Sequence, residues 1–385
     1  MSGEPGFRAL VREFARGVVG PRAAEIDRDH RFPRDLIREA SRLGLLGVLV
    51  PTAYGGLGLD HRCFAACIEE LAEACASTAV IVDVHGSVAT EPILRFGSEE
   101  QRRTWLPPLA RGEVLGAFAL TEPGSGSDAA GLRTTARRRG AEWVLTGTKT
   151  FITNVGEAGL YVVFARTGEA PGARGISAFL VPAGSPGLRV GQVFEKMGLH
   201  GSPTGELVLE EVRVPVANLL HAPGRGFEVA MRCLDSGRIG ISAQALGIAG
   251  AALGEVLDWA RGRGRAGREA AVALAGPAAR LEAGRGLVEW AARRCSAGLP
   301  FTREASMAKL FCTDLAMEVT STALEVTGGA EAGEGLERRF RDAKALQIYE
   351  GTNQIQRLVI ARQLLGRPAA GRASPASGGT AGHPG

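Results

Sequence analysis

Apolar residues recur at helical spacing through the first part of the chain. Three stretches carry the pattern: VREFARGVVGPRAAEIDRD, FPRDLIREASRLGLL and CFAACIEELAEAC. Apolar positions three and four residues apart share one face of a helix, and that face packs into a core. The stretch RFGSEEQ adds a helix start with acidic residues in the first turn. We predict an N-terminal helical domain over residues 1–115.

The pattern changes at residue 116 and changes back near residue 227. Between these points, short β-branched or alternating runs are separated by Gly and Pro, as in EWVLTGTKTFITN, LYVVFARTG, ISAFLVPA and GELVLEEVRVP. They predict a small β-domain, a barrel or a sandwich, over residues 116–226. Helical patterns return in MEVTSTALEVTG and TNQIQRLVIARQLLG and predict helices over residues 227–366. Residues 367–385, rich in Pro, Gly, Ser and Ala, predict a disordered tail.

Length and charge narrow the class of protein. A chain of 385 residues suits two or three packed domains. The net charge of +4 is not gathered into a basic stripe with interleaved aromatic residues, which argues against nucleic-acid binding. The N-terminus MSGEPGFRAL lacks a secretory apolar core, and no apolar run looks long enough to span a bilayer. We therefore expect a cytoplasmic protein without a membrane contact.

The cysteines indicate no metal site. They form no CxxC pair and have no histidine at metal-ligand spacing. In a reducing compartment such residues are most often buried small apolar side chains. We expect this of all six: Cys63, Cys67, Cys75, Cys233, Cys295 and Cys312.

Two segments of the predicted β-domain could hold a ligand. Leu120–Asp128 (LTEPGSGSD) follows an apolar strand. Its glycines and small hydroxyl residues would let main-chain N–H groups converge on an anion or a ring edge, although a plain turn fits equally well. Thr148–Thr153 (TKTFIT) offers hydroxyls and a Phe that could cover a planar ring, although it also fits an ordinary strand.

A third segment, Tyr349–Arg357 (YEGTNQIQR), places a carboxylate between two predicted helices. Glu350 precedes Gly351 in the break, and Thr352 is placed to cap the following helix. A Glu at a helix start is usually solvated. Glu350, however, stands between Ile348-Tyr349 and an apolar helix, which suits a partly desolvated pocket. Desolvation raises the pKa of a carboxylate and makes it a better base.

These segments resemble the acyl-CoA dehydrogenase family, especially its short-chain members. The resemblance runs from about Phe7 to Gly366 and includes LDSGRIGISAQALGIA, FRDAK and IYEGTNQIQRLVIA. It implies an α+β fold with an N-terminal helical domain, a central β-barrel domain and a C-terminal four-helix bundle. It also implies a homotetramer in which FAD lies between the β-domain and the bundle, and in which a neighbouring subunit completes the FAD site.

The resemblance implies residue roles wherever the motifs match. Glu350 matches the general base. The implied FAD-binding residues are Phe118, Leu120, Thr121, Gly126, Ser127, Phe151, Thr153, Arg263, Gly329, Thr352 and Gln354. The implied substrate-binding residues are Ser127, Leu234, Asp235, Arg238, Tyr349 and Gly351. Some relatives carry the base on the helix of Asp235 and Arg238, where this chain has Gly237, so Glu350 is the one candidate.

The implied reaction desaturates an acyl-CoA between Cα and Cβ. Glu350 removes the α-proton while a hydride leaves Cβ for the flavin. Hydrogen bonds to the thioester carbonyl, one of them from the Glu350 main-chain N–H, stabilise the developing enolate. The resemblance implies an electron-transfer flavoprotein as the electron acceptor.

Several positions depart from the family pattern. Relatives carry Arg-x-x-Phe-Gly where this chain reads Arg263-Gly-Arg-Ala-Gly267, and two glutamines are replaced by Leu274 and Pro277. A Gln-x-x-Gly-Gly motif becomes Glu325–Gly329, followed by Ala330-Glu-Ala. The extra glycines and Pro277 should weaken or kink the helices here. These changes predict weaker FAD binding or an altered oligomer.

The departures keep three alternatives open. One is the same desaturation of an acyl group tethered to a carrier protein. The second is a flavin monooxygenase, against which Glu350 argues. The third is a non-catalytic, flavin-poor partner subunit, against which the intact LTEPGSGSD and YEGT segments argue.

Overall fold

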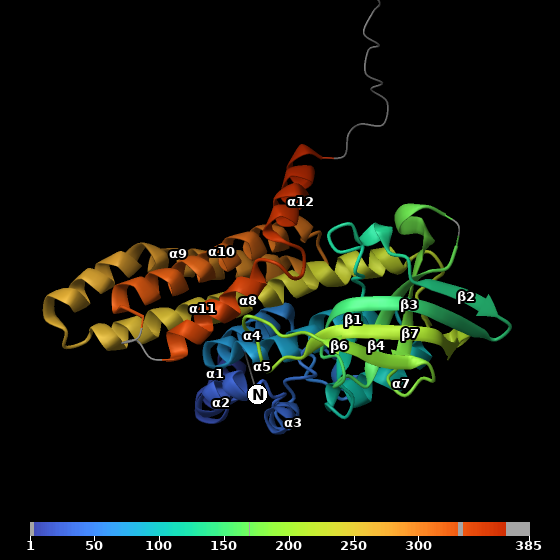
Figure 1. The fold of residues 1–385 in the computed structure, drawn as a ribbon, viewed down its shortest axis with the longest axis horizontal. Coiled ribbons are helices and arrows are strands. Elements are labelled where there is room, and N and C mark those ends of the chain that lie inside the picture. Colours follow the sequence, from blue (N-terminus) through green and yellow to red (C-terminus); the bar gives the residue numbers. More distant parts are fainter. Residues whose placement is uncertain (1–3, 169, 330–333, 367–385) are drawn as a thin grey trace, which may run out of the picture.

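The computed structural model describes residues 4–168, 170–329 and 334–366 (Figure 1). The predicted disordered tail and the Ala330 departure lie outside these residues. The described chain is helical at both ends and forms a sheet in the middle, so the predicted α–β–α order is confirmed.

The N-terminal third is a layer of helices beneath the bundle and beside the sheet (Figure 1). The helix start predicted in RFGSEEQ is present: Ser98 and Gln101 exchange side-chain to main-chain hydrogen bonds in a capping box. The helices are α1 (Glu4–Phe14), α2 (Ala23–Asp29), α3 (Arg34–Arg42), α4 (His61–Ala74), α5 (Ala76–Asp83), α6 (Glu91–Phe96) and α7 (Glu99–Ala110). Two π-helical segments, Ala15–Val19 and Val84–Thr90, and two 3-10 turns, Gly20–Arg22 and Thr52–Tyr54, join them.

The central third is one eight-stranded mixed sheet. Its order is β6-β7-β3-β2-β4-β5-β8, with β1 alongside β4. β4 (LYVVFAR) is buried almost throughout, since both of its faces are covered. The strands are β1 (Gly116–Ala119), β2 (Thr135–Arg139), β3 (Glu142–Thr153), β4 (Leu160–Arg166), β5 (Ile176–Pro182), β6 (Leu188–Val193), β7 (Thr204–Pro215) and β8 (Leu219–Leu220). Short 3-10 turns lie at Ala129–Gly131, Gly172–Gly175 and Val216–Asn218.

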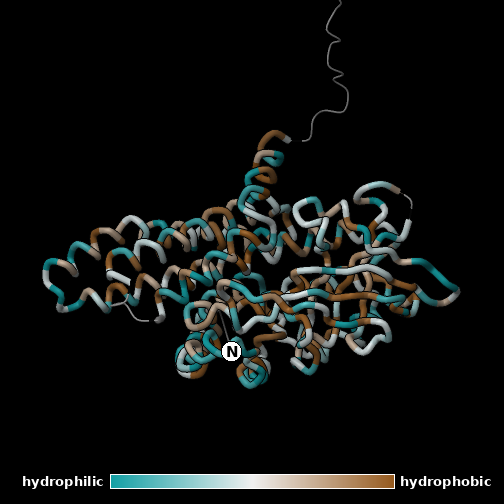
Figure 2. The backbone as a smooth tube through the Cα atoms, in the orientation of Figure 1, coloured by the Kyte–Doolittle hydropathy of each residue, from teal (hydrophilic) through white to brown (hydrophobic). Residues whose placement is uncertain are grey.

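The C-terminal third is a bundle of long helices. They are α8 (Gly226–Ala260), α9 (Gly264–Ser296), α10 (Thr302–Thr327), α11 (Glu334–Leu346) and α12 (Asn353–Leu365). The first four lie side by side, whereas α12 projects from the body (Figure 1). Apolar and polar residues are interleaved along these helices, as the tube in Figure 2 shows. α8 is buried over most of its length, whereas α12 buries only Asn353 and Gln356.

One expectation about these helices is wrong, the absence of a run long enough to span a bilayer, whereas the weakening or kinking expected from the glycines and Pro277 stays a prediction. α9 is a continuous helix through Pro277; Gly262, in the turn before it, and Gly264, its first residue, have φ of 82° and 56°. Gly267 lets α9 approach α8 closely, because a Cβ there would lie 2.2 Å from the Ala260 carbonyl oxygen. α8 is long and apolar enough to span a bilayer by length and composition, contrary to the prediction, although 78% of its most apolar window is buried inside the protein.

Candidate active site

Glu350 lies in the break between α11 and α12, as predicted. Both Glu350 and Gly351 have positive φ, 57° and 89°. This conformation is uncommon for a residue with a side chain and costs of order 1–3 kcal/mol unless the surroundings impose it. Thr352 caps α12 by accepting a hydrogen bond from the Ile355 N–H (3.3 Å), which confirms the predicted helix start.

Buried donors hold this strained turn by its carbonyl oxygens. Lys309 Nζ donates to the Gly351 oxygen at 2.9 Å. Gln356 Nε2 donates to the oxygens of both Glu350 (3.3 Å) and Gly351 (2.9 Å), and Arg238 Nε lies 3.5 Å from the Glu350 oxygen. Three side chains from three helices therefore fix the backbone that aims the carboxylate.

The Glu350 carboxylate packs against α8 at Gly237, in a space that we call the Gly237 notch. A Cβ at Gly237 would lie 2.3 Å from Glu350 Oε2, so only glycine leaves room for the acid. Oε2 is buried and has no hydrogen-bond partner within the described parts of the chain. Burial raises the pKa of Glu350 to about 7, although the charges of Arg238 and Lys309 oppose the rise. A carboxylate of this kind is a base suited to neutral pH.

Two cations flank the acid. Arg238 donates through Nη1 to Asp235 Oδ1 (2.6 Å), and Asp235 also accepts a hydrogen bond from Thr302 Oγ1. Burial lowers the pKa of Lys309 to about 7, and the Glu350 charge opposes that effect. Arg238 and Lys309 thus place positive charge behind the turn.

Tyr349, the residue before Glu350, is half-buried and anchored by its hydroxyl. Its hydroxyl donates to Gln244 Oε1 at 2.6 Å, and Gln244 Nε2 donates to the Ala76 carbonyl oxygen at 2.9 Å. This chain of hydrogen bonds ties the break to α8 and α5.

On the sheet side, a buried ion pair shapes the Gly-rich loop. Glu122 accepts hydrogen bonds from Lys149 Nζ (2.8 Å) and from the main-chain N–H groups of Arg133 (2.6 Å) and Thr134 (2.9 Å). Lys149 also donates to the Leu120 oxygen at 3.1 Å, and burial lowers its pKa to about 8. Both residues stand inside the motifs LTEPGSGSD and TKTFIT, but nothing in the chain's pattern pairs them. A cavity of about 260 Å³ opens beside this loop.

The loop and β3 present an exposed aromatic ring and accessible main-chain groups, which are features that suit a planar ring and an anion. Phe151 is 65% exposed with φ of 56°, at an irregularity in the β3–β7 pairing, and its ring centre lies 5.2 Å from that of Phe194. An aromatic side chain held out at a strained backbone position indicates a binding surface. Gly124 and Gly126 are exposed and face open space, so their main chain is accessible to an anion.

The other predicted flavin residues divide into two groups. Phe118 and Leu120 pack into the apolar core of the sheet, where Phe118 contacts Phe164 at 4.8 Å between ring centres. Leu234 on α8 and Tyr349 pack against this same core. The remaining positions are accessible to differing degrees: Thr121, Thr153 and Thr352 are half-buried, whereas Ser127 and Gln354 are exposed.

Arg263 and Gly329 are not brought to the Glu350 site within one chain. Gly226, at the start of α8, packs on β5, and α8 is 35 residues long. At 1.5 Å per residue its far end is about 50 Å from the sheet. Arg263 lies just beyond that end, over the Trp259 ring at 4.5 Å. Gly329 follows the last turn of α10 with φ of 68°.

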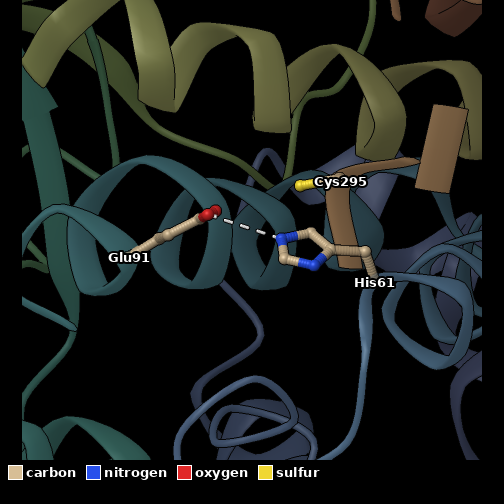
Figure 3. A group of neighbouring side chains, drawn as sticks. All are labelled: His61, Glu91 and Cys295. Atoms are coloured by element: carbon tan, nitrogen blue, oxygen red, sulfur yellow. Dashed lines mark ion pairs between the residues drawn. The ribbon is translucent and has the colours of Figure 1, made fainter. Parts of the chain in front are cut away.

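Two features near the site were missed from the sequence. Asp83, inside the apolar run STAVIVDVHGS, is fully buried beside α8, and an acid in such a run was the available signal. His61, Glu91 and Cys295 converge in the interior (Figure 3), where Cys295 lies beside Ser236 of α8. All six cysteines are buried, as predicted. Cys295, however, faces an imidazole and a carboxylate that no sequence spacing connects.

The His61–Glu91–Cys295 group has the ligand types of a metal site but already contains a cation. His61 Nε2 lies 3.4 Å from Glu91 Oε1. Arg95 donates to the same carboxylate and lies 3.7 Å from Cys295 Sγ. A guanidinium in contact with two of the three side chains supplies the positive charge that a metal ion would bring. We therefore interpret the group as a buried ion-pair network.

Three family models match the chain in order. "Acyl-CoA dehydrogenase, N-terminal domain" matches residues 4–113, the middle domain residues 117–212 and the C-terminal domain residues 224–365.

Individual relatives match over nearly their whole length. An acyl-CoA dehydrogenase of Bacillus subtilis is 47% identical over 368 residues, which cover 94% of this chain and 97% of the relative. The mitochondrial short-chain specific acyl-CoA dehydrogenase of Homo sapiens is 45% identical, over 92% of this chain and 88% of the relative. The solved butyryl-CoA dehydrogenase from Megasphaera elsdenii superposes with a TM-score of 0.92 at 40% identity, covering 95% of this chain and 98% of that chain. With the helix–sheet–helix order and the strained, desolvated Glu350, these matches show that the chain belongs to the acyl-CoA dehydrogenase family.

Proposed function

We propose that this protein is an FAD-dependent dehydrogenase of short or branched acyl-CoA thioesters, with Glu350 as the base that removes the α-proton. The observation that carries the proposal is the Glu350 carboxylate itself, held in the Gly237 notch with a pKa of about 7. Such a base is half-ionised near neutral pH and can take a weakly acidic proton. FAD, when bound, would take up the hydride that leaves Cβ, and with it both electrons of the oxidation.

The chain's own residues would orient the thioester and exclude water. Lys309, Gln356 and Arg238 hold the Glu350–Gly351 carbonyl oxygens, so the Glu350 main-chain N–H keeps a fixed direction. We assign that N–H to the thioester carbonyl, where it stabilises the developing enolate. The carboxylate approaches the α-carbon with little reorganisation because its backbone is already fixed.

The FAD- and substrate-binding residues predicted from the motifs are part of this proposal. Ser127, Thr121, Phe151 and Thr153 would contact the flavin and the arm of the substrate. Asp235 and Arg238 would form the wall behind the thioester. The domain division at residues 115 and 226 is likewise proposed, and it agrees with the positions of the helices and the sheet.

We also propose a homo-oligomer, a tetramer by analogy with the family. α12 projects from the body (Figure 1), and Leu364 and Leu365 near its end are 65% and 86% exposed. A groove of about 450 Å³ lies among α9, α10 and α12. Arg263, about 50 Å from its own sheet, could reach FAD only in a second copy. Light scattering should give four chains per particle, and Leu364→Asp should give fewer.

The acceptor and the compartment complete the proposal. The electrons leave the flavin for an electron-transfer flavoprotein, and the enzyme works in the cytoplasm. The buried setting of α8 agrees with a core helix.

An anaerobic spectrum tests the proposed function. Butyryl- or isobutyryl-CoA should bleach the flavin absorbance of the purified protein, and should not do so in Glu350→Gln, which keeps the flavin. Bound flavin that no acyl-CoA bleaches would contradict a CoA-ester substrate and support the carrier-tethered alternative. Failure to hold FAD after reconstitution would contradict the proposal as a whole.

A further inference from the structure

Asp83 is a fully buried acid whose carboxylate oxygens accept no hydrogen bond from the described residues. It ends α5. Ser87 Oγ donates to the Asp83 main-chain oxygen (2.7 Å), not to the carboxylate. A buried carboxyl group without a partner destabilises a fold, so its presence indicates a function.

The Asp83 carboxylate lies on the same face of α8 as the catalytic base. A Cβ at Gly240 would lie 1.9 Å from Asp83 Oδ1, just as a Cβ at Gly237 would lie 2.3 Å from Glu350 Oε2. Helix positions three apart are neighbours, about 5–6 Å from each other. Gly237 and Gly240, about one turn apart, therefore leave room for two neighbouring carboxyl groups. Within the described chain, Oε2 of Glu350 and both Oδ atoms of Asp83 have no hydrogen-bond partner.

The nearby cations use their donors elsewhere. Arg238 donates to Asp235, Ser306 and the Glu350 oxygen. Lys309 donates to Gly351 and Asn353. Burial raises the pKa of Asp83 well above its usual range, and the charge of Glu350 adds to the rise. The acid beside the base thus accepts no hydrogen bond through its carboxylate oxygens from the described residues, and the neighbouring Ser87 hydroxyl only opposes the rise in its pKa.

We propose that Asp83 recognises a hydrogen-bond donor, a hydroxyl or an ammonium group, on the acyl chain of the substrate beyond Cβ. This rests on the proposed function, because Glu350 defines where Cα lies. The spacing of about 5–6 Å along α8 places the donor on Cγ or a later carbon.

The physical reason for selectivity is the unpaired state of the acid. An unsubstituted acyl chain would leave Asp83 buried and unpaired, whereas a donor would satisfy it. Sites built to hydrogen-bond a substrate group reject the analogue that lacks it far more strongly than apolar pockets reject an extra group. We expect at least a roughly tenfold preference for the hydroxylated chain.

Competing substrates test the proposal. kcat/KM is measured for 4-hydroxybutyryl-CoA and butyryl-CoA with the holoenzyme and with Asp83→Ala. The wild type should prefer the hydroxy ester at least tenfold, and Asp83→Ala should reverse or abolish the preference. Removing an unpaired buried acid should not unfold the protein, and melting temperature checks this. Asp29→Ala, an exposed acid on α2, is the matched control and should keep the wild-type ratio.

Binding measurements on a variant that cannot turn over test the role of Asp83 independently of the proposed reaction. In Glu350→Gln, which cannot turn over, titration of the flavin spectrum with each ester gives an affinity ratio. A preference for the hydroxy ester that disappears in Asp83→Ala/Glu350→Gln supports the role of Asp83 even if wild-type turnover fails. Equal affinities, with equal kcat/KM, would overturn it. So would an Asp83→Ala variant that shifts the pH profile for both esters alike but leaves their ratio unchanged.

Discussion

Gly237 and Glu350 are in such close contact that a methyl group on the first would displace the carboxylate of the second. A Cβ added to Gly237 would lie 2.3 Å from Oε2 and 2.8 Å from both Cδ and Oε1. Gly237→Ala should therefore move the base and lower kcat about 10²-fold, the cost of misplacing a catalytic group by about 1 Å. Anaerobic flavin reduction by butyryl-CoA measures this.

Gly254 on the same helix provides a matched control. A Cβ there meets nothing within 4 Å. Gly254→Ala should keep full activity and stabilise the protein by about 0.5–1 kcal/mol, because Gly is unfavourable inside a helix. Full activity in Gly237→Ala would contradict the assignment of Glu350 as the base.

The pH profile of kcat/KM should carry a limb set by Glu350. The base must be ionised to accept the proton, and burial raises its pKa to about 7, so activity should rise with pH through about 7. Lys309 lowers that pKa. Lys309→Met should therefore move the limb to higher pH. A limb near the usual pKa of a Glu, about 4.3, would show that Glu350 is solvated instead.

Replacing Phe151 tests whether its ring contacts the flavin, and the replacement should have little effect on folding. Its ring is 65% exposed, so Phe151→Ala should change the free energy of unfolding of the apoprotein little. Loss of an aromatic contact worth about 0.5–1.5 kcal/mol should weaken FAD binding up to about tenfold. Fluorescence titration of the apoprotein with FAD measures this. Val193→Ala, also exposed, should bind FAD as the wild type does; an unchanged affinity in Phe151→Ala would exclude contact with the ring.

Local features of the site could be predicted from the sequence because they depend on neighbours in the chain. The Glu350 break and the Thr352 cap follow from a short polar run between apolar helices, and both are present. Helical and strand periodicity likewise predicted the helix–sheet–helix order.

The features that were missed depend on contacts between distant segments. Gly237 was seen only as a position that cannot supply a base, although its missing side chain is what admits Glu350. The His61–Glu91–Cys295 group is recognisable only once α4, α6 and α9 are packed on α8. Asp83 is visible in the sequence as an acid in an apolar run, but its neighbour Glu350 is not.

The buried network around Glu91 should contribute to the free energy of unfolding over a pH range that follows from the pKa values of Glu91 and His61. Burial alone would raise the pKa of Glu91 and lower that of His61, but their mutual attraction outweighs it, with help from Arg95 at Glu91 and from Cys295 at His61. The pKa of Glu91 falls to about 2 and that of His61 rises to about 10. The Glu91 contribution is therefore present above its unfolded pKa and lost as pH falls through about 2. The His61 contribution is present below its unfolded pKa and lost as pH rises through about 10.

Removing one side chain of this network should consequently lower the free energy of unfolding more than removing one side chain of a surface ion pair. Glu91→Gln leaves His61 and Arg95 without their carboxylate and should lower the free energy of unfolding by about 3–5 kcal/mol at pH 7, as for a broken buried pair. Glu113→Gln, which breaks the exposed Arg111 pair, should cost less than about 1 kcal/mol. Urea denaturation of both variants measures the difference. Because Arg95 supplies the positive charge, treatment with a chelator should leave the melting temperature unchanged; a fall that zinc restores would show that His61, Glu91 and Cys295 bind a metal ion instead.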